Sequence, residues 1–162
     1  MKPQPERYSR RPLPAYRYTP GADRPHPIRD PEGHSYGCET PPEPFEPADW
    51  RNSATYLYAI DLFNGGFWWE AHEALEALWL GSGRTGPTAD FLRALIQLAA
   101  ACLKVRAGNR RAAQGLLTRG LPGLESAGDA VAGISTAALS GQIADYVEGT
   151  RLAEPVIRLG DC

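Results

Sequence analysis

One stretch of this sequence concentrates side chains that can bind a metal or transfer protons. His72, Glu73 and Glu76 lie within residues 68–80, which are rich in Ala, Leu and Glu and are therefore predicted to form a helix. Side chains four residues apart on a helix meet on one face, so His72 and Glu76 converge. Burying such groups costs free energy unless they pair or bind a ligand. This cluster is therefore the candidate functional site.

The spacing His72-Glu73-x-x-Glu76 is similar to the HExxH pattern, in which two histidines bind zinc and the glutamate acts as general base. Because a glutamate stands at the last position, the ligand set suits Zn, Mn or Fe and does not select among them. The pattern assigns His72 and Glu76 as metal ligands and Glu73 as the catalytic residue. A third ligand must come from elsewhere, and the sequence has only two other histidines, His26 and His34.

Other interpretations of the cluster stay open. A histidine can hydrogen-bond to neighbouring polar groups without any ligand, and the same residues can perform acid–base chemistry without a metal. Glu70, Glu73 and Glu76 also resemble the carboxylate series that binds Mg²⁺ in all-α nucleotide pyrophosphatases. Those enzymes need a second acidic pair, whereas the next helix offers only Asp90 and Gln97, so this interpretation is the weakest.

The same helix has an apolar side that predicts how the cluster is oriented. At 100° per residue, one side holds Trp68, Ala71, Leu75, Leu78 and Trp79. Trp69 falls beside His72 and could wall a pocket, and Gln97, an amide in an apolar helix, is expected to contact the cluster. By the same geometry, Glu70 and Ala77 are expected to face solvent.

Helices are the elements that must position these residues. Apolar residues recur with a spacing near 3.6 in five segments, at about residues 47–62, 67–80, 87–107, 111–124 and 136–148. Gly and Asn separate several of them, Pro122 is expected to end or kink the fourth, and residues 155–159 are expected to be extended. No strand partner is evident, so the sequence predicts a compact all-α bundle of about five helices.

The proline content divides the chain into residues 1–46 and a helical domain at residues 47–162. Twelve of the fifteen prolines lie at or before Pro47, which nearly excludes helix from the first part. A disordered tail is one interpretation. Large apolar side chains such as Tyr16, Ile28 and Phe45 favour another: an extended arm that packs over the bundle from about residue 13, with a frayed start.

The bulk composition limits the partners and the compartment. A net charge of −2 gives no reason to expect nucleic acid or an anionic membrane as partner. No apolar run reaches the roughly 18 residues of a membrane span. Three cysteines without CxxC spacing argue against a disulfide framework, and no signal peptide is visible, so we expect a cytoplasmic protein. The partner would be an unidentified small molecule or protein, or a second copy of the chain.

The helical part resembles the bacterial domain of unknown function 309 family over about residues 50–124. The resemblance rests on Asn64, Gly66, Glu70, His72, Glu73, Glu76 and Trp79, followed by Phe91, Leu92, Leu95, Ile96 and Gln97, and by the Gly108-Asn109 turn. The arm is similar to an extension in some longer members. The resemblance implies a small all-helical bundle and no established activity.

Two hypotheses about function follow. In the first, the protein is a metal-dependent hydrolase: His72 and Glu76 bind the metal with His26 or His34, and Glu73 activates a bound water. In the second, it is a non-enzymatic helical binding or oligomerisation module, and the His/Glu cluster is a buried polar network that fixes the helix register.

Overall fold

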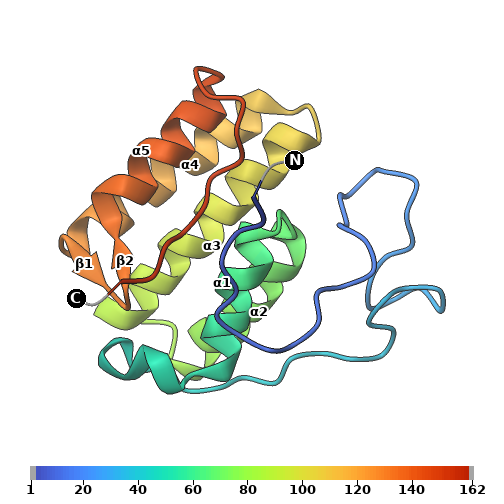
Figure 1. Cartoon of the computed structure of the whole chain (residues 1–162), viewed down its shortest axis with the longest axis horizontal. Helices are drawn as coiled ribbons and strands as arrows, with labels where there is room; N and C mark the ends of the chain where they lie inside the picture. The colour runs from blue at the N-terminus through green and yellow to red at the C-terminus, as the bar shows by residue number, and fades with distance from the viewer. Residues whose placement is uncertain (1–2, 161–162) are drawn as a thin grey trace.

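Helix α3, Pro87–Arg106, is the centre of the molecule and packs against α2 (Trp68–Gly81), α4 (Arg110–Ser126) and α5 (Thr136–Glu148) (Figure 1). The computed structural model describes residues 3–160. Its elements in chain order are η1 (Pro47–Asn52), α1 (Ala54–Asn64), α2 (Trp68–Gly81), α3, α4 (Arg110–Ser126), β1 (Ala130–Val131), β2 (Ile134–Ser135) and α5 (Thr136–Glu148). The predicted all-α bundle of about five helices, with an extended Pro-rich arm, is confirmed.

The first predicted helix is divided in two. Residues 47–52 form the 3-10 helix η1, and Ser53 then interrupts the chain in an extended conformation. The Ser53 hydroxyl accepts a hydrogen bond from the Tyr56 backbone N–H, which caps α1. Gly66 ends the connection to α2 with a φ of +75°, a conformation that favours glycine. The hydrogen-bonding serine was the signal for this break.

Two smaller features also differ from the sequence expectation. Pro122 lies inside α4 and the helix continues to Ser126, so the proline does not end it. Between α4 and α5 the chain forms a short antiparallel hairpin, in which Ala130 pairs with Ser135 and Val131 with Ile134. The expectation of no strand is therefore wrong, although the hairpin is too small to change the fold class.

The N-terminal arm, described from residue 3, lies over α1 and α2 and then loops away from the bundle (Figure 1). Its first anchor is Asp61, a buried carboxylate on α1 that accepts hydrogen bonds from the backbone N–H groups of Tyr8 and Ser9 at 2.8 and 2.9 Å. The Ser9 hydroxyl and the Arg7 guanidinium also contact this carboxylate, at 2.7 and 3.0 Å. Contact with the body thus begins before residue 13, earlier than expected.

The C-terminal segment is extended, as predicted, and runs back beside α5 across α3 (Figure 1). Among the cysteines, Cys102 is buried in α3, and its burial raises the pKa of the thiol well above the usual range. Cys38 is exposed, and Cys162 lies outside the described residues. Within residues 3–160, no helix is both long and apolar enough to cross a membrane.

Candidate metal site on helix α2

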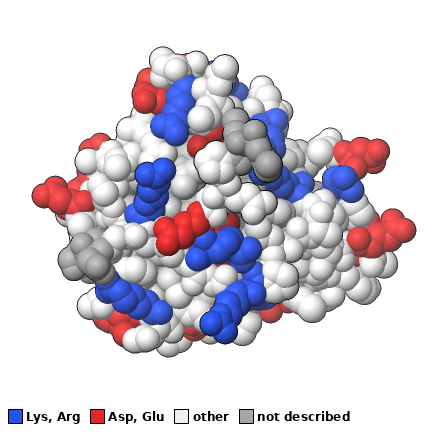
Figure 2. All heavy atoms as spheres, in the orientation of Figure 1, with Lys and Arg blue, Asp and Glu red and all other residues white. Residues whose placement is uncertain are grey.

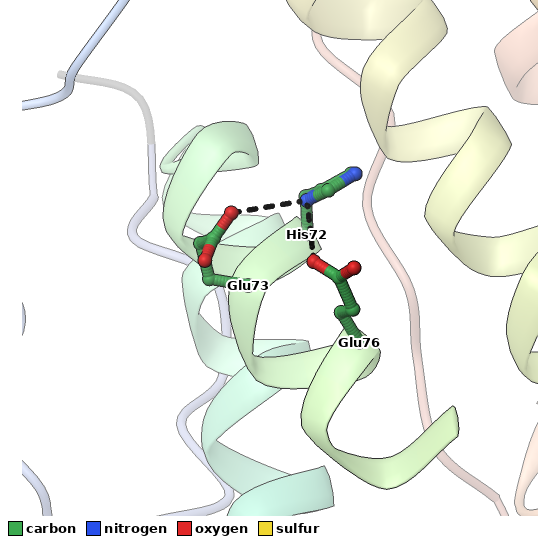
Figure 3. Close-up of side chains that lie close together, drawn as sticks. All are labelled: His72, Glu73 and Glu76. Atoms are coloured by element: carbon green, nitrogen blue, oxygen red, sulfur yellow. Dashed lines mark ion pairs between the residues drawn. The ribbon is translucent and has the colours of Figure 1, made fainter. Parts of the chain in front are cut away.

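The structure brings His72, Glu73 and Glu76 together on one shoulder of α2 (Figure 3). The His72 Nδ1 atom lies 3.4 Å from Oε1 of Glu73 and 3.9 Å from Oε2 of Glu76. One ligand atom from each residue can be chosen so that all three lie within 4.8 Å of one another. Their side chains are partly exposed, at 32%, 38% and 42% in that order, so solvent can reach the cluster.

The apolar side of α2 fixes this orientation. Trp68, Ala71, Leu75 and Leu78 are buried in the core, as the helical periodicity predicts, while Trp79 is half-buried. Because these residues hold the helix against α1 and α3, the three polar side chains lie at the edge of the buried face.

The distances suit a small divalent cation. Two ligands of a tetrahedral ion bound at roughly 2.0–2.1 Å lie about 3.3–3.4 Å apart, which is close to the 3.4 Å between His72 and Glu73. The separation of 3.9 Å between His72 and Glu76 closes to that value with a small rotamer change. The Glu73 carboxylate lies closer to the His72 Nδ1 atom than the Glu76 carboxylate does, so Glu73, predicted as the base, belongs to the same candidate ligand group.

Glu70 lies elsewhere, and the expectation that it faces solvent is wrong. It is buried, because the arm covers this side of α2. Its Oε1 atom is 2.9 Å from Nε2 of His34 and accepts a hydrogen bond from the Tyr18 backbone N–H at 3.1 Å. The side chains of His34 and Glu70 are only 4% and 6% exposed. The second oxygen of Glu70, Oε2, is buried and has no hydrogen-bond partner among the described residues. Ala77, also expected at the surface, is buried as well.

The arm histidines therefore have their own surroundings. His26 accepts hydrogen bonds at Nδ1 from the backbone N–H groups of Ile28 and Arg29, at 3.3 and 3.2 Å. Its ring packs against Trp69 and Tyr18, with each pair of ring centroids 5.2 Å apart. Among residues 3–160, the group of three or more clustered metal-binding side chains contains neither His26 nor His34.

The two remaining pocket candidates also face other partners. Trp69 is half-buried beneath the arm, edge-on to Tyr18 at a centroid distance of 5.3 Å. Gln97 is half-buried and packs closely against Gly120 of α4. A Cβ atom added to Gly120 would lie only 3.3 Å from the Gln97 Cβ. Asp61 was not among the residues predicted to be functional, although a lone carboxylate between Ile60 and Leu62 in an apolar helix is a signal for a buried anchor.

A comparison with known families finds one match that bears on this site. Residues 56–116, which include α2 and α3, match the family described as Domain of unknown function (DUF309). The match spans all three residues of the cluster and Glu70. No curated protein matches the chain.

Proposed function

We propose that this chain, whose residues 56–116 match the domain of unknown function 309 family, binds a divalent metal through His72, Glu73 and Glu76 and uses it for hydrolysis. The observation that carries the proposal is the convergence of three ligand atoms within 4.8 Å on one partly exposed helix shoulder. Imidazole and carboxylate ligands suit Zn, Mn or Fe.

The chemistry follows from the number and exposure of the ligands. Three protein ligands leave at least one coordination position for water, which is typical of catalytic sites and not of closed structural ones. A divalent ion bound there would lower the pKa of its coordinated water toward neutrality, and so would supply hydroxide. A carboxylate that binds through one oxygen can accept a proton on the other, so Glu73 can combine ligation with its predicted role as base.

The exposure of the cluster weighs against the alternative that it is a buried polar network. Side chains that are 32% to 42% exposed do not need one another in order to avoid desolvation. A buried His/Glu pair does exist in this molecule, and it is the pair of His34 and Glu70.

Metal titration tests the proposal directly. Untagged protein is titrated with Zn²⁺, Mn²⁺ and Fe²⁺ in competition with a chromogenic chelator, and we expect one equivalent to bind. His72→Ala and Glu76→Gln should weaken binding at least about tenfold, as the loss of a ligand would. The control Glu148→Gln, an exposed glutamate on α5, should bind like the wild type. Equal affinity in all four proteins would contradict the site.

Hydrolysis is tested separately. Chromogenic carboxylic and phosphoric esters are offered to metal-loaded, metal-free and His72→Ala protein at several pH values. Turnover by the loaded wild type alone supports the hydrolase. Stoichiometric metal binding without turnover of any ester would leave a metal-binding protein and reject the hydrolytic part.

A further inference from the structure

The extended segment of residues 154–160 is held by the helical body in the way that a groove holds a peptide. Gln142 on α5 accepts a hydrogen bond from the Val156 backbone N–H and donates one to the Val156 carbonyl, both at 3.1 Å. Asn64 on α1 makes the same pair of bonds with Ile157, both at 2.7 Å. Two side-chain amides thus replace a neighbouring strand, and they bind the backbone, independently of its side chains.

The side chains of the segment alternate as they do in a strand. Pro155 and Ile157 are buried, Val156 and Leu159 are half-buried, and Arg158 is exposed, so the alternation is clearest from Pro155 to Arg158. Ile157 enters the core and borders a small apolar cavity that α1, α3 and α5 also line. Alternate side chains therefore fill pockets, while the amides of Asn64 and Gln142 hold the backbone.

Each end of the segment has its own anchor. At the start, Oε1 of Glu154 lies 3.0 Å from the Arg106 guanidinium and 3.4 Å from that of Arg17. Arg106 is held in place because it lies over the Trp68 ring, 4.0 Å from the centroid. The first residue is thus recognised by charge.

At the other end, the Leu159 N–H donates to the Tyr8 hydroxyl at 3.1 Å, and the Gly160 N–H donates to the Gly133 carbonyl at 2.9 Å. Charge, backbone and apolar recognition are thus all present along one groove.

The connection between α5 and this segment contributes much less. Gly149 reverses the chain with a φ of +84°, and the residues after it are mostly exposed, with Leu152 at 93%. The segment is therefore attached to its groove through a surface connector, while the contacts that bind it are made with the body. The same contacts can form with a body that belongs to another chain.

We propose that the groove between α1 and α5 also binds residues 154–160 of a second copy of this chain, so that two copies exchange their C-terminal segments. The occupant is this segment because its acidic first residue, its proline and its alternating aliphatic residues match the groove that holds it. In one chain the short connector gives the segment an effective concentration in the millimolar range, so native chains should exchange segments only when the protein concentration approaches that value. The length of the connector therefore decides which form predominates.

Changing the connector tests this. Deletion of residues 151–153 should prevent the segment from reaching its own groove, and the shortened chain should then form a dimer, measured by light scattering coupled to size exclusion. Insertion of six Gly/Ser residues at the same place should leave a monomer. Adding Asn64→Ala and Gln142→Ala to the shortened chain should weaken the dimer at least tenfold. A shortened chain that stays monomeric, with residues 154–160 open to protease, would overturn the proposal.

A second measurement keeps the test decisive if the shortened chain does not fold. In the full chain, Ile157→Asp should release the segment, and a labelled peptide of residues 154–160 should then bind saturably by fluorescence anisotropy. A peptide carrying the same Asp, or a protein that also carries Asn64→Ala, should bind at least tenfold more weakly. No binding of the wild-type peptide to folded Ile157→Asp protein would overturn the proposal.

Discussion

Helix α2 carries two His/Glu groups that use the same residue types and differ in what covers them. Glu70 pairs with His34 beneath the arm, where both side chains are almost fully buried. His72, Glu73 and Glu76 lie on another shoulder of the helix and remain accessible to solvent (Figure 3). The difference shows that residue type alone does not make a site: the covered pair is committed to holding the arm, and the uncovered cluster has ligand atoms to offer.

The separation follows from helical geometry. Glu70 and His72 are two residues apart, so their side chains differ by roughly 200° around the helix axis. The arm crosses the side of Glu70 and places Tyr18 and His34 against it. A buried carboxylate must be paired, because an unpaired buried charge loses its hydration without gaining a compensating interaction. A carboxylate at the surface carries no such requirement.

The charged side chains on the face drawn in Figure 2 are mixed in sign. On the face drawn in Figure 2, basic side chains are spread singly or in small groups, with acidic side chains between them and at the edge. The net charge of −2 is therefore not gathered into a broad field on this face. Metal affinity would have to come from local ligand geometry and not from long-range attraction.

The largest expected effect is on stability at the covered pair. Glu70→Ala removes the partner of a buried histidine and of the Tyr18 N–H, so the free energy of unfolding should fall by about 3 kcal/mol. The matched change Glu73→Ala, on the same helix but partly exposed, should change it by less than about 0.5 kcal/mol. Urea unfolding followed by circular dichroism measures both. Similar losses in the two variants would remove the distinction between the groups.

The next effect should appear only at the uncovered cluster. A ligand that binds only the folded protein stabilises it by about 2.7 kcal/mol at a concentration of 100 times Kd. Saturating metal should therefore raise the melting temperature of the wild type and of His34→Ala, and leave that of His72→Ala unchanged. Differential scanning calorimetry with and without chelator measures the shift. If His34→Ala abolished the shift and His72→Ala kept it, the site would belong under the arm.

These two groups also show where sequence reasoning succeeds and fails. Helical periodicity located the helices and the buried side of α2, because each helix packs its apolar stripe into one core. It placed Glu70 in solvent because a helical wheel treats any polar side as exposed. The arm that buries Glu70 has no periodicity, so its path cannot be read from spacing. The HExxE spacing placed His72 beside Glu73 and Glu76, since that geometry is local to one helix.

A smaller effect is expected at His34. Its ring is buried against Glu70 and hydrogen-bonded to Ser35, and His34→Ala leaves the Tyr18 N–H bond to Glu70 in place. Loss of the two side-chain hydrogen bonds of His34, to Glu70 and to Ser35, should lower the free energy of unfolding by about 1–2 kcal/mol. The arm should loosen locally, so trypsin should cleave after Arg17 and Arg29 faster than in the wild type. Unchanged cleavage in a destabilised variant would mean that His34 acts on the body and not on the arm.

The smallest expected effect is the most informative one. In metal-free protein, His72→Ala and Glu76→Ala should each change the free energy of unfolding by less than about 0.5 kcal/mol, because partly exposed ion pairs on a helix contribute about that much. A buried polar network would instead lose roughly 1–3 kcal/mol in either variant. Urea unfolding in excess chelator separates the two, with Glu148→Ala as an exposed control. A loss of that size in both variants would assign the cluster a structural role. Variants that keep their stability and lose metal binding would show that these residues serve metal binding and not the stability of the fold.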